Sequence, residues 1–496
     1  MPPADLAAVA PLPDATLEDL RPYAGAYPRV PVWMTIPDTG RSPSETFRVL
    51  KRLSHQCYIL QSAEPDGERG RYTFLGHQPV LGVSIADGRL TLDGVLKLTL
   101  EPNDPGAVID RIIADNACPI IAGLPPFTGG LVGYISYDYA RYAEPALRFD
   151  AADTEGFRDL DLMFFDRVIA YDHATDTIVL IALVKTDALE ENYHHARAEL
   201  ADLARLIATG EMADFVPLRL TSPWREMFDE ERFSAMVEQG KHFIHEGDIF
   251  QVVLSNRLDA DATGSLFTTY ERLREINPSP YMFYFSSDDL EIAGASPETL
   301  VRYHDGRALT FPLAGSRPRG STPEEDARLE AELLADPKEL AEHRMLVDLG
   351  RNDIGRIAEY GTVRVDDYMS VSHFSHVMHI GSTVSGVPRP GVTARQILDS
   401  VLPAGTLSGA PKIRAMEIID QLEGVKRGVY GGAIGYIGVT GEMDTCIAIR
   451  LAFKKDGVVY VRSGAGVVAD SVPAAEYAET RAKARAVMTA LEEASA

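Results

Sequence analysis

Two pairs of glutamates are the residues whose spacing most directly suggests chemistry. Glu339 and Glu342 lie in "DPKELAEH", and Glu476 and Glu479 lie in "AAEYAET". A spacing of three residues places both carboxylates of a pair on one helix face. Two such faces that converge could hold a hard divalent cation, and Mg²⁺ prefers about six oxygen ligands.

Each glutamate taken alone also has a structural explanation. The Asp-Pro pair before Glu339 is typical of a helix start, which would give Glu339 a capping-box position. Glu342 can pair with Lys338, four residues earlier on the same face. Glu479 can pair with Lys483 in the same way. For a single glutamate the structural explanation is favoured, and only the matched pairs favour a metal site.

The overall charge narrows the classes of partner. Asp and Glu number 73 and Lys and Arg number 48 among 496 residues, a formal net charge of −25. Such an excess of acid argues against nucleic acids and anionic membranes as partners. An anionic substrate would therefore need local cations at its binding site.

The cysteines and the apolar runs predict where in the cell the protein is located. Cys57, Cys118 and Cys446 show no metal-ligand spacing, and an odd, sparse count is typical of a reducing compartment. The N-terminus lacks the cationic start of a signal peptide, and the apolar run "TIVLIALV" is far too short to span a membrane. We therefore expect a cytoplasmic protein.

The order of strand and helix patterns predicts an α+β fold. Residues 1–28 form a lead-in, residues 29–210 a strand-rich N-terminal lobe that ends in a helix, and residues 228–492 a second lobe. In the second lobe we predict one strand over 444–453 and a last helix over 473–494.

Two further features of the pattern concern local structure. Residues 321–359 are predicted to form two helical pieces divided at an Asp-Pro pair. The segments "GGLVGYI" (129–135) and "GGAIGYI" (431–437) echo one another. Seven residues are too few to establish a repeat, because Gly-Gly before an apolar strand is common turn chemistry.

A series of ordered motifs covers most of the chain. They are "GRYTFLG" (70–76), "PPFTGGLVGYISYDYARY" (125–142), "GDIFQVVLSNR" (247–257), "NPSPYMFYF" (277–285), "GASPETLVR" (294–302), "FPLAGSRPRG" (311–320), "SHVMHIGSTVSG" (375–386), "PAGTLSGAPKIRAMEIID" (403–420), "GVYGGAIGYIG" (428–438), "CIAIR" (446–450) and "SGAGVVADSVPAAEYAET" (463–480).

With these motifs the chain resembles the chorismate-utilising enzymes, and specifically the synthase component (component I) of anthranilate synthase, over about residues 30–490. The resemblance implies a two-lobed fold with large, mainly antiparallel sheets flanked by helices. It implies the first committed step of tryptophan biosynthesis, in which chorismate and ammonia give anthranilate and pyruvate through 2-amino-4-deoxyisochorismate, with Mg²⁺. A separate glutamine amidotransferase subunit would supply the ammonia, so we expect a hetero-oligomer.

The resemblance also implies how a dianionic substrate is held. Glu342 and Glu479 would be the main Mg²⁺ ligands, with Glu339 and Glu476 beside them, and the ion would hold the ring carboxylate. The other carboxylate would meet Arg450 and backbone N–H groups of the "SGAG" segment. Further substrate contacts are implied at Gln251, Gly315, Ser316, Tyr430, Gly464, Ala465 and Gly466. Alone, "SGAG" is equally typical of a tight turn between a strand and a helix.

Three residues match catalytic positions of the family. Loss of the C4 hydroxyl needs an acid whose pKa is raised by a dry site, and Glu298 in "SPET" matches that acid. His379 in "VMHIG" matches the residue that removes the C2 proton as pyruvate leaves. Thr406 in "GTLSG" matches a residue on the substrate side. Without the motifs, an isolated histidine on an apolar strand is usually a core residue.

Two positions bear on which chorismate enzyme this is. Relatives that add water at C2 carry lysine where Gln251 stands, and relatives that make 4-amino-4-deoxychorismate commonly carry lysine where Ala314 stands. Neither side chain here can do the lysine's chemistry, which favours anthranilate. Aminodeoxyisochorismate synthase and aminodeoxychorismate synthase remain the alternatives.

A regulatory site is implied in the N-terminal lobe, which would also contact the partner subunit. The family binds tryptophan, a feedback inhibitor, through "LLES" and "PYM". Here "ILQS" has Gln61 in place of Glu and keeps Ser62, and Pro280, Tyr281 and Met282 are all present. We expect tryptophan to inhibit the enzyme. Plain sheet packing also explains these residues.

Two rival functions are open at this point. "GAGVVA" (464–469) fits a dinucleotide fingerprint, but no second strand with an acidic ribose ligand follows it. A catalytically dead tryptophan sensor is the other rival, and the filled catalytic positions argue against it.

Overall fold

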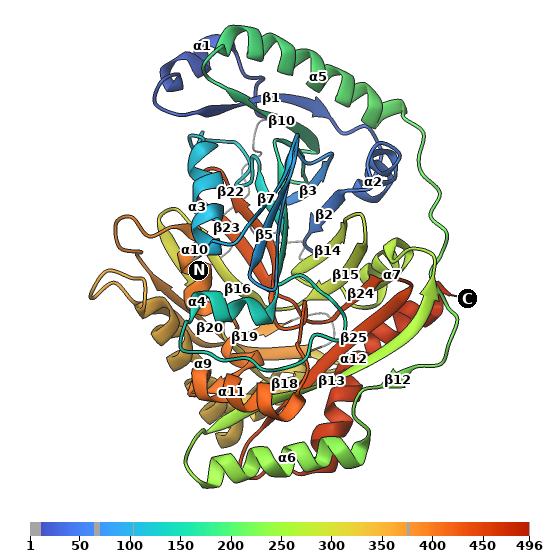
Figure 1. Ribbon diagram of the computed structural model, residues 1–496, viewed down its shortest axis with the longest axis vertical. Coiled ribbons are helices and arrows are strands. Elements are labelled where there is room, and N and C mark those ends of the chain that lie inside the picture. The colour runs from blue at the N-terminus through green and yellow to red at the C-terminus, as the bar shows by residue number, and fades with distance from the viewer. Residues whose placement is uncertain (1–10, 64–69, 103, 374–376, 496) are drawn as a thin grey trace.

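The computed structural model describes residues 11–63, 70–102, 104–373 and 377–495, so the first ten residues of the predicted lead-in lie outside the described part. The chain folds into two large sheets flanked by helices (Figure 1). Every pair of neighbouring strands in the two described sheets runs antiparallel. The predicted α+β class is confirmed.

The first sheet has 13 strands. Their order is β1 (Arg29–Pro37), β10 (Thr177–Lys185), β9 (Arg167–Asp172), β3 (Tyr72–His77), β2 (Cys57–Gln61), β14 (Tyr281–Ser286), β15 (Leu290–Ser296), β24 (Leu451–Lys455), β25 (Val458–Val467), β13 (Gln251–Thr263) and β11 (Arg219–Leu220), with β12 (Arg225–Glu226) and β21 (Gly409–Ala410) also paired to β13.

The second sheet has 12 strands. Their order is β18 (Leu313–Pro318), β20 (Val377–Gly386), β17 (Arg307–Thr310), β16 (Thr299–His304), β23 (Met443–Ile447), β22 (Ala433–Gly438), β7 (Gly130–Ile135), β8 (Leu160–Phe165), β4 (Leu81–Ala86), β5 (Arg89–Asp93) and β6 (Lys97–Leu100), with β19 (Arg364–His373) paired to β20.

Each sheet contains strands from both predicted lobes. The N-terminal strands join the others at the β2–β14 pair in the first sheet and at the β7–β22 pair in the second. Aromatic side chains pack between the sheets across these junctions, with ring centroids 4.7 Å apart for Tyr58 and Phe165. Both sheets therefore contain strands from either side of the boundary predicted at 210–228.

The helices include those predicted at the end of the N-terminal lobe, within 321–359 and at 473–494. Those in the described residues are α1 (Leu17–Leu20), α2 (Pro43–Lys51), α3 (Pro105–Asp115), α4 (Ala140–Ala143), α5 (Leu189–Thr209), α6 (Glu230–His245), α7 (Phe267–Ile276), α8 (Pro323–Ala335), α9 (Pro337–Gly355), α10 (Ala394–Val401), α11 (Lys412–Glu423) and α12 (Pro473–Ala494), with 3₁₀ turns η1 (Arg21–Tyr23), η2 (Tyr137–Tyr139) and η3 (Gly405–Leu407).

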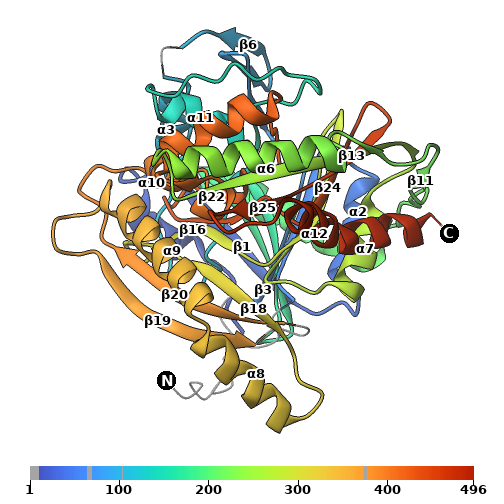
Figure 2. The same ribbon diagram turned by 90° about the horizontal axis from the view of Figure 1, so that it is seen from below.

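Two of these helices carry the glutamate pairs. The predicted division between α8 and α9 is confirmed, because the Asp336 side chain accepts hydrogen bonds from the backbone N–H groups of Lys338 and Glu339. Helix α9 packs on β18 and β20 of the second sheet, and α12 packs on β25 of the first (Figure 2).

The chain crosses between the sheets at two neighbouring places. Glu298 lies where β15 of the first sheet leads into β16 of the second, and Arg450 lies where β23 of the second leads into β24 of the first. The single strand predicted over 444–453 is therefore wrong. The chain turns out of one sheet at Arg450, which has a φ of +55°. Two backbone hydrogen bonds join the crossovers, Ala295 N to Arg450 O at 3.0 Å and Ile447 N to Glu298 O at 3.0 Å.

The two echoing glycine segments are partner strands. In the β7–β22 pair, Gly133 lies opposite Gly435, and both have a φ of 155°. A Cβ on Gly435 would lie 2.1 Å from the carbonyl oxygen of Asp444, and a Cβ on Gly133 would lie 2.1 Å from that of Asp161. The similar sequences thus serve equivalent positions at the junction of the second sheet.

We expect Gly435→Ala to destabilise the protein by about 1–3 kcal/mol, because its Cβ would press against the neighbouring strand's backbone. Urea unfolding of the purified variant measures this loss. Gly355→Ala is the matched control, since a Cβ there meets nothing within 4 Å and should leave stability unchanged or slightly higher. Equal stability of both variants would contradict the close approach.

Candidate active site

Glu298 is a carboxyl group placed in a dry environment. Burial raises its pKa to about 8, against smaller opposing effects of a hydrogen bond from Thr406 and of the charge on Lys483. Thr406 Oγ1 in η3 donates to Glu298 Oε1 at 3.2 Å. The predicted acid and the predicted Thr406 therefore meet, and near pH 7 the carboxyl is largely protonated.

His379 lies in β20 opposite Ser316 of β18, at a bulge formed by Gly315 with a φ of +65°. His379 Nδ1 lies 2.8 Å from the carbonyl oxygen of Gly315. Because a carbonyl only accepts, Nδ1 carries the proton and Nε2 is the basic nitrogen of the neutral ring. Burial, and to a lesser extent the charge of Arg450, lowers the pKa of His379, so the ring stays neutral near pH 7.

Arg450 is a cation with no counter-ion among the described residues. Burial lowers its pKa, and within the described residues its guanidinium forms no ion pair. The other two deeply buried arginines of this region, Arg427 and Arg462, both pair with Glu423. A desolvated, unpaired guanidinium is suited to bind an anion.

The "SGAG" segment lies within β25 and pairs with β13, so the turn considered from the sequence is not formed. A Cβ on Gly464 would lie 2.8 Å from the Tyr430 hydroxyl, and one on Gly466 would lie 2.7 Å from Gln251 Nε2. These glycines let two predicted substrate contacts approach the strand, with Ala465 between them. A dinucleotide fingerprint needs a strand-to-helix turn at these glycines, so that rival is not supported.

Gln251 has an unsatisfied acceptor. Its side chain is 5% exposed, and its Oε1 has no hydrogen-bond partner in the part of the chain that the structure describes. A buried acceptor of this kind is costly unless a ligand or water donates to it.

The two acidic helix faces influence one another. The pKa of Glu342 is raised by burial, by Glu339 on its own helix and, to a smaller extent, by Glu479 on α12. The pKa of Glu476 is raised by burial and by Glu479, and Lys338 of α9 acts on it in the opposite direction. Carboxylates from α9 and α12 therefore face a common region.

These carboxylates fit a hard divalent cation in chemistry and in charge, since a cation would relieve their mutual repulsion. Among these four described residues, no three offer oxygens within 4.8 Å of one another. Glu339 lies 3.6 Å from Arg317 Nη1, and Glu479 Oε1 lies 2.6 Å from Lys483 Nζ. Protein cations thus balance part of this charge.

Lys483 is a site residue whose importance the sequence did not reveal. Besides its ion pair with Glu479, its Nζ donates to the carbonyl oxygen of Gly464 at 3.1 Å. It therefore joins the acidic face of α12 to the "SGAG" strand. The sequence indicated only a helical pair at a spacing of four residues.

The residues predicted to bind tryptophan line one pocket at the junction of the two lobes' strands. Ser62, Pro280, Tyr281 and Met282 all face it, together with Gln61 and with residues of β22 and β23 in the second sheet. Gln61 accepts a hydrogen bond from the Tyr270 hydroxyl at 3.2 Å. The four residues are therefore brought together, and their ligand stays a prediction.

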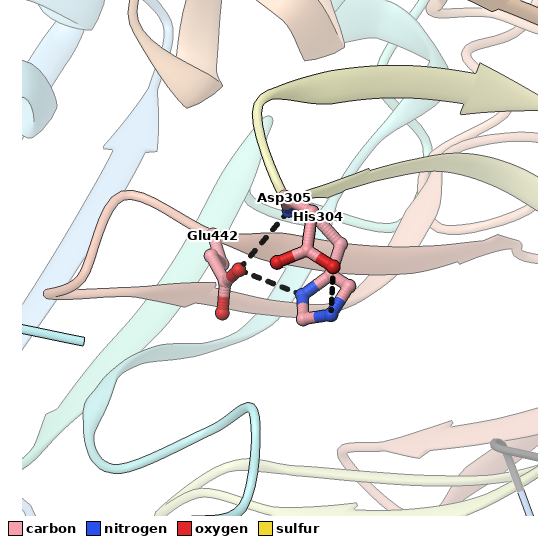
Figure 3. Close-up of side chains that lie close together, drawn as sticks. All are labelled: His304, Asp305 and Glu442. Carbon is pink, nitrogen blue, oxygen red and sulfur yellow. Dashed lines mark hydrogen bonds and ion pairs between the residues drawn. The ribbon is translucent and has the colours of Figure 1, made fainter. Parts of the chain in front are cut away.

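A separate cluster of candidate metal ligands lies at the turns after β16 and before β23 (Figure 3). His304 Nδ1 lies 2.7 Å from Glu442 Oε1, and His304 Nε2 lies 3.4 Å from Asp305 Oδ2. One ligand atom of each residue lies within 4.8 Å of the others, and Glu442 Oε1 also accepts from the backbone N–H of Asp305 at 3.4 Å. The cluster is better explained as a hydrogen-bonded pair of turns.

Comparison with known proteins places the chain in a family. The family model for chorismate binding enzyme matches residues 57–489. The chain belongs to this family. Anthranilate synthase component 1 of Acinetobacter calcoaceticus is 43% identical, covering 94% of this chain and 96% of the relative, and that of Pseudomonas aeruginosa is 43% identical, covering 96% and 98%.

Solved structures agree with the sequence comparison. Anthranilate synthase component I from Streptococcus pneumoniae has a TM-score of 0.73 and 39% identity, covering 84% of this chain and 92% of that one. The menaquinone-specific isochorismate synthase MenF from Escherichia coli, at 19% identity and a TM-score of 0.68, shares the fold. The predicted resemblance and the prediction of a chorismate-utilising enzyme are confirmed.

Among the described residues, no helix combines the length and the apolar character that crossing a membrane requires.

Replacing Arg450 by Met should stabilise the ligand-free protein slightly, by about 1 kcal/mol, because a buried unpaired charge is removed. Arg462→Met is the matched comparison and should destabilise it by about 3 kcal/mol, since Arg462 pairs with Glu423 at 2.7 Å. Thermal unfolding of both variants measures the difference. A loss of stability in Arg450→Met equal to that in Arg462→Met would show that Arg450 has a structural counter-charge.

Proposed function

We propose that this protein is the synthase subunit of an anthranilate synthase, which converts chorismate and ammonia to anthranilate and pyruvate. The observation that carries the proposal is a carboxyl group of raised pKa, that of Glu298, which accepts a hydrogen bond from Thr406. Glu298 lies on a crossover whose backbone is hydrogen-bonded to the crossover of Arg450, and the Arg450 guanidinium forms no ion pair within the described residues. The relatives named anthranilate synthase component 1 support the choice of reaction.

Substrate binding uses both ends of the dianion. Arg450 binds the enolpyruvyl carboxylate, with the Tyr430 hydroxyl and backbone N–H groups of residues 464–466 beside it. Burial raises the pKa of Tyr430 to about 12, so its hydroxyl stays a donor. Glu342 and Glu479, with Glu339 and Glu476 beside them, would hold Mg²⁺, which would supply positive charge for the ring carboxylate.

The first step forms the C2–N bond as ammonia attacks, and the ring double bonds shift while the C4–O bond breaks. Glu298 donates its proton to the departing hydroxyl, which leaves as water. The product of this step is 2-amino-4-deoxyisochorismate, formed once the amine has lost a proton. The hydrogen bond from Thr406 orients the carboxyl toward the ring.

The second step makes the ring aromatic. The neutral His379 accepts the C2 proton at Nε2, the C3–O bond breaks, and the enolpyruvyl group leaves as pyruvate after protonation. Gly315 holds the ring of His379 through Nδ1 in the required tautomer. A chain that stopped before this step would be an aminodeoxyisochorismate synthase, and product analysis separates the two.

The nucleophile is ammonia because Gln251 stands where the relatives that add water carry the lysine that activates it. Gln251 offers a buried acceptor to an N–H group and cannot deprotonate water, and Ala314 cannot act as a nucleophile. A glutamine amidotransferase, the second component that the relatives' names imply, supplies the ammonia in a hetero-oligomer. The three buried, unpaired cysteines support a cytoplasmic location.

Tryptophan binds the pocket lined by Ser62, Pro280, Tyr281 and Met282 and inhibits the enzyme. The lining combines aromatic surface for an indole with hydroxyl and carboxylate groups for the polar end of an amino acid. Gln61 replaces the carboxylate that the family motif places there, so the α-ammonium has a weaker partner.

Glu298→Gln should lower the rate of anthranilate formation by about 10²–10⁴-fold with little change in the KM for chorismate, because Gln cannot donate a proton. In the wild type the rate should fall as pH rises through about 8, since the protonated carboxyl is the active form and is lost above its pKa. Fluorescence of anthranilate, with chorismate, Mg²⁺ and ammonium present, measures both. An active Glu298→Gln variant would refute the assignment.

Gln61→Glu should tighten tryptophan binding by about five- to tenfold, because the ammonium gains a charged acceptor at the rim of the pocket. Isothermal titration with tryptophan measures the affinity, and anthranilate fluorescence measures the inhibition. Gln78→Glu, an exposed position outside the pocket, is the control and should leave both unchanged. Unchanged affinity in Gln61→Glu would place the ammonium elsewhere.

A further inference from the structure

A fully buried cluster of charged side chains lies next to elements of the candidate active site. None of its residues takes part in the reaction steps proposed above. Glu423 is the last residue of α11, Arg427 follows it, and Arg462 lies in β25. Their side chains are at most 1% exposed. Arg427 donates to both carboxylate oxygens of Glu423, at 2.5 and 3.0 Å, and Arg462 donates to one of them at 2.7 Å.

Arg427 uses the rest of its guanidinium on the backbone of two site elements. Its Nη1 donates to the carbonyl oxygen of Leu407 at 2.6 Å, and its Nη2 donates to that of Val253 at 2.7 Å. Leu407 directly follows Thr406 in η3, and Val253 lies two residues after Gln251 in β13. One planar group therefore fixes the loop of Thr406 relative to the strand of Gln251.

The same cluster is also hydrogen-bonded to the strand next to the "SGAG" segment. Ser255 Oγ donates to Glu423 Oε1 at 2.9 Å and accepts from Arg462 Nε at 2.9 Å. Ser255 lies opposite Gly464 in the β13–β25 pair. The cluster thus joins three predicted site elements, η3, β13 and β25, at their buried side.

Burying three charges is an expensive way to fill a core, and apolar residues of similar volume often stabilise a fold as well or better. Apolar residues could not hold two carbonyl groups in fixed directions, which the planar fork of an arginine does. The geometry therefore points to a requirement for position rather than for stability.

We propose that Arg427 is a positioning residue of the reaction, which holds η3 so that the Thr406 hydroxyl reaches Glu298. The inference rests on the proposed function, in which Glu298 is the acid. It adds that Arg427, which touches no substrate, positions the Thr406 hydroxyl against Glu298 through its hydrogen bond to the carbonyl group of Leu407.

The test uses the pH dependence of the rate. The hydrogen bond from Thr406 lowers the pKa of Glu298, so its loss should raise that pKa and move the alkaline fall in kcat to higher pH. Arg427→Lys keeps the charge and loses the planar fork. It should shift the alkaline fall upward in the same sense as Thr406→Val, and lower kcat by about tenfold with the KM for chorismate changed less than about twofold.

Rates are measured as anthranilate fluorescence between about pH 7 and pH 10, with the concentration of free NH₃ held constant across the range. The double variant Arg427→Lys/Thr406→Val should show no shift beyond that of Thr406→Val alone, because both changes remove one hydrogen bond. Arg414→Lys is the matched control. Arg414 pairs with Asp248 and Glu417 at a half-exposed site, so this variant should behave as wild type.

Folding of each variant is checked by thermal unfolding and circular dichroism. If Arg427→Lys does not fold, Glu423→Gln takes its place, because it removes the charge that orients Arg427 and should shift the alkaline fall in the same sense. A folded variant with a lowered kcat and an alkaline fall at the wild-type pH would overturn the positioning role. A Thr406→Val variant without a shift would instead overturn the role of Glu298 and the inference with it.

Discussion

The structure depends on two crossovers that pass side by side between the sheets. A chain that leaves one sheet and enters another must expose backbone groups at the crossing, and buried backbone groups need partners. Here the crossovers satisfy each other, through the hydrogen bonds from Ala295 to Arg450 and from Ile447 to Glu298. The requirement of backbone pairing therefore joins the backbone segments of an acid and of a cation that lie about 150 residues apart in the sequence.

The same crossovers explain how an acidic protein can offer a site to a dianion. The net charge of −25 is spread over the surface, whereas the arginines near the site are buried. Burial removes solvent screening, so Arg450 acts at short range with a strength that distant surface carboxylates cannot match. Burial disfavours the charged form of both groups, but it keeps only Glu298 neutral near pH 7, because the ordinary pKa of an arginine lies far above 7.

The sequence predicted what depends on local chemistry. The Asp-Pro pair gave the start of α9, and the last helix was predicted over 473–494, the range that α12 occupies. It did not predict that residues 444–453 divide between two sheets, because the apolar run from Cys446 to Phe453 is interrupted only by Arg450. The positive φ of Arg450 is set by the tertiary structure and has no signal such as glycine in the sequence.

In the candidate site, too, the sequence revealed relations between neighbouring residues but not contacts between distant elements. The spacing of the glutamates predicted that each pair shares a helix face, but their influence across α9 and α12 depends on how two helices pack on different sheets. Lys483 was visible only as a helical partner of Glu479, since its bond to Gly464 is made by the packing of α12 on β25.

The predicted tryptophan pocket and the candidate acid share one crossover. The Tyr281 hydroxyl, which faces the pocket, lies 2.9 Å from the hydroxyl of Thr299 and donates to Asp444 at 2.8 Å. Thr299 directly follows Glu298, and Cys446 of the pocket lining directly precedes Ile447, which donates to Glu298. Because both sites are built on the same two short segments, the backbone that forms one of them also limits the geometry of the other.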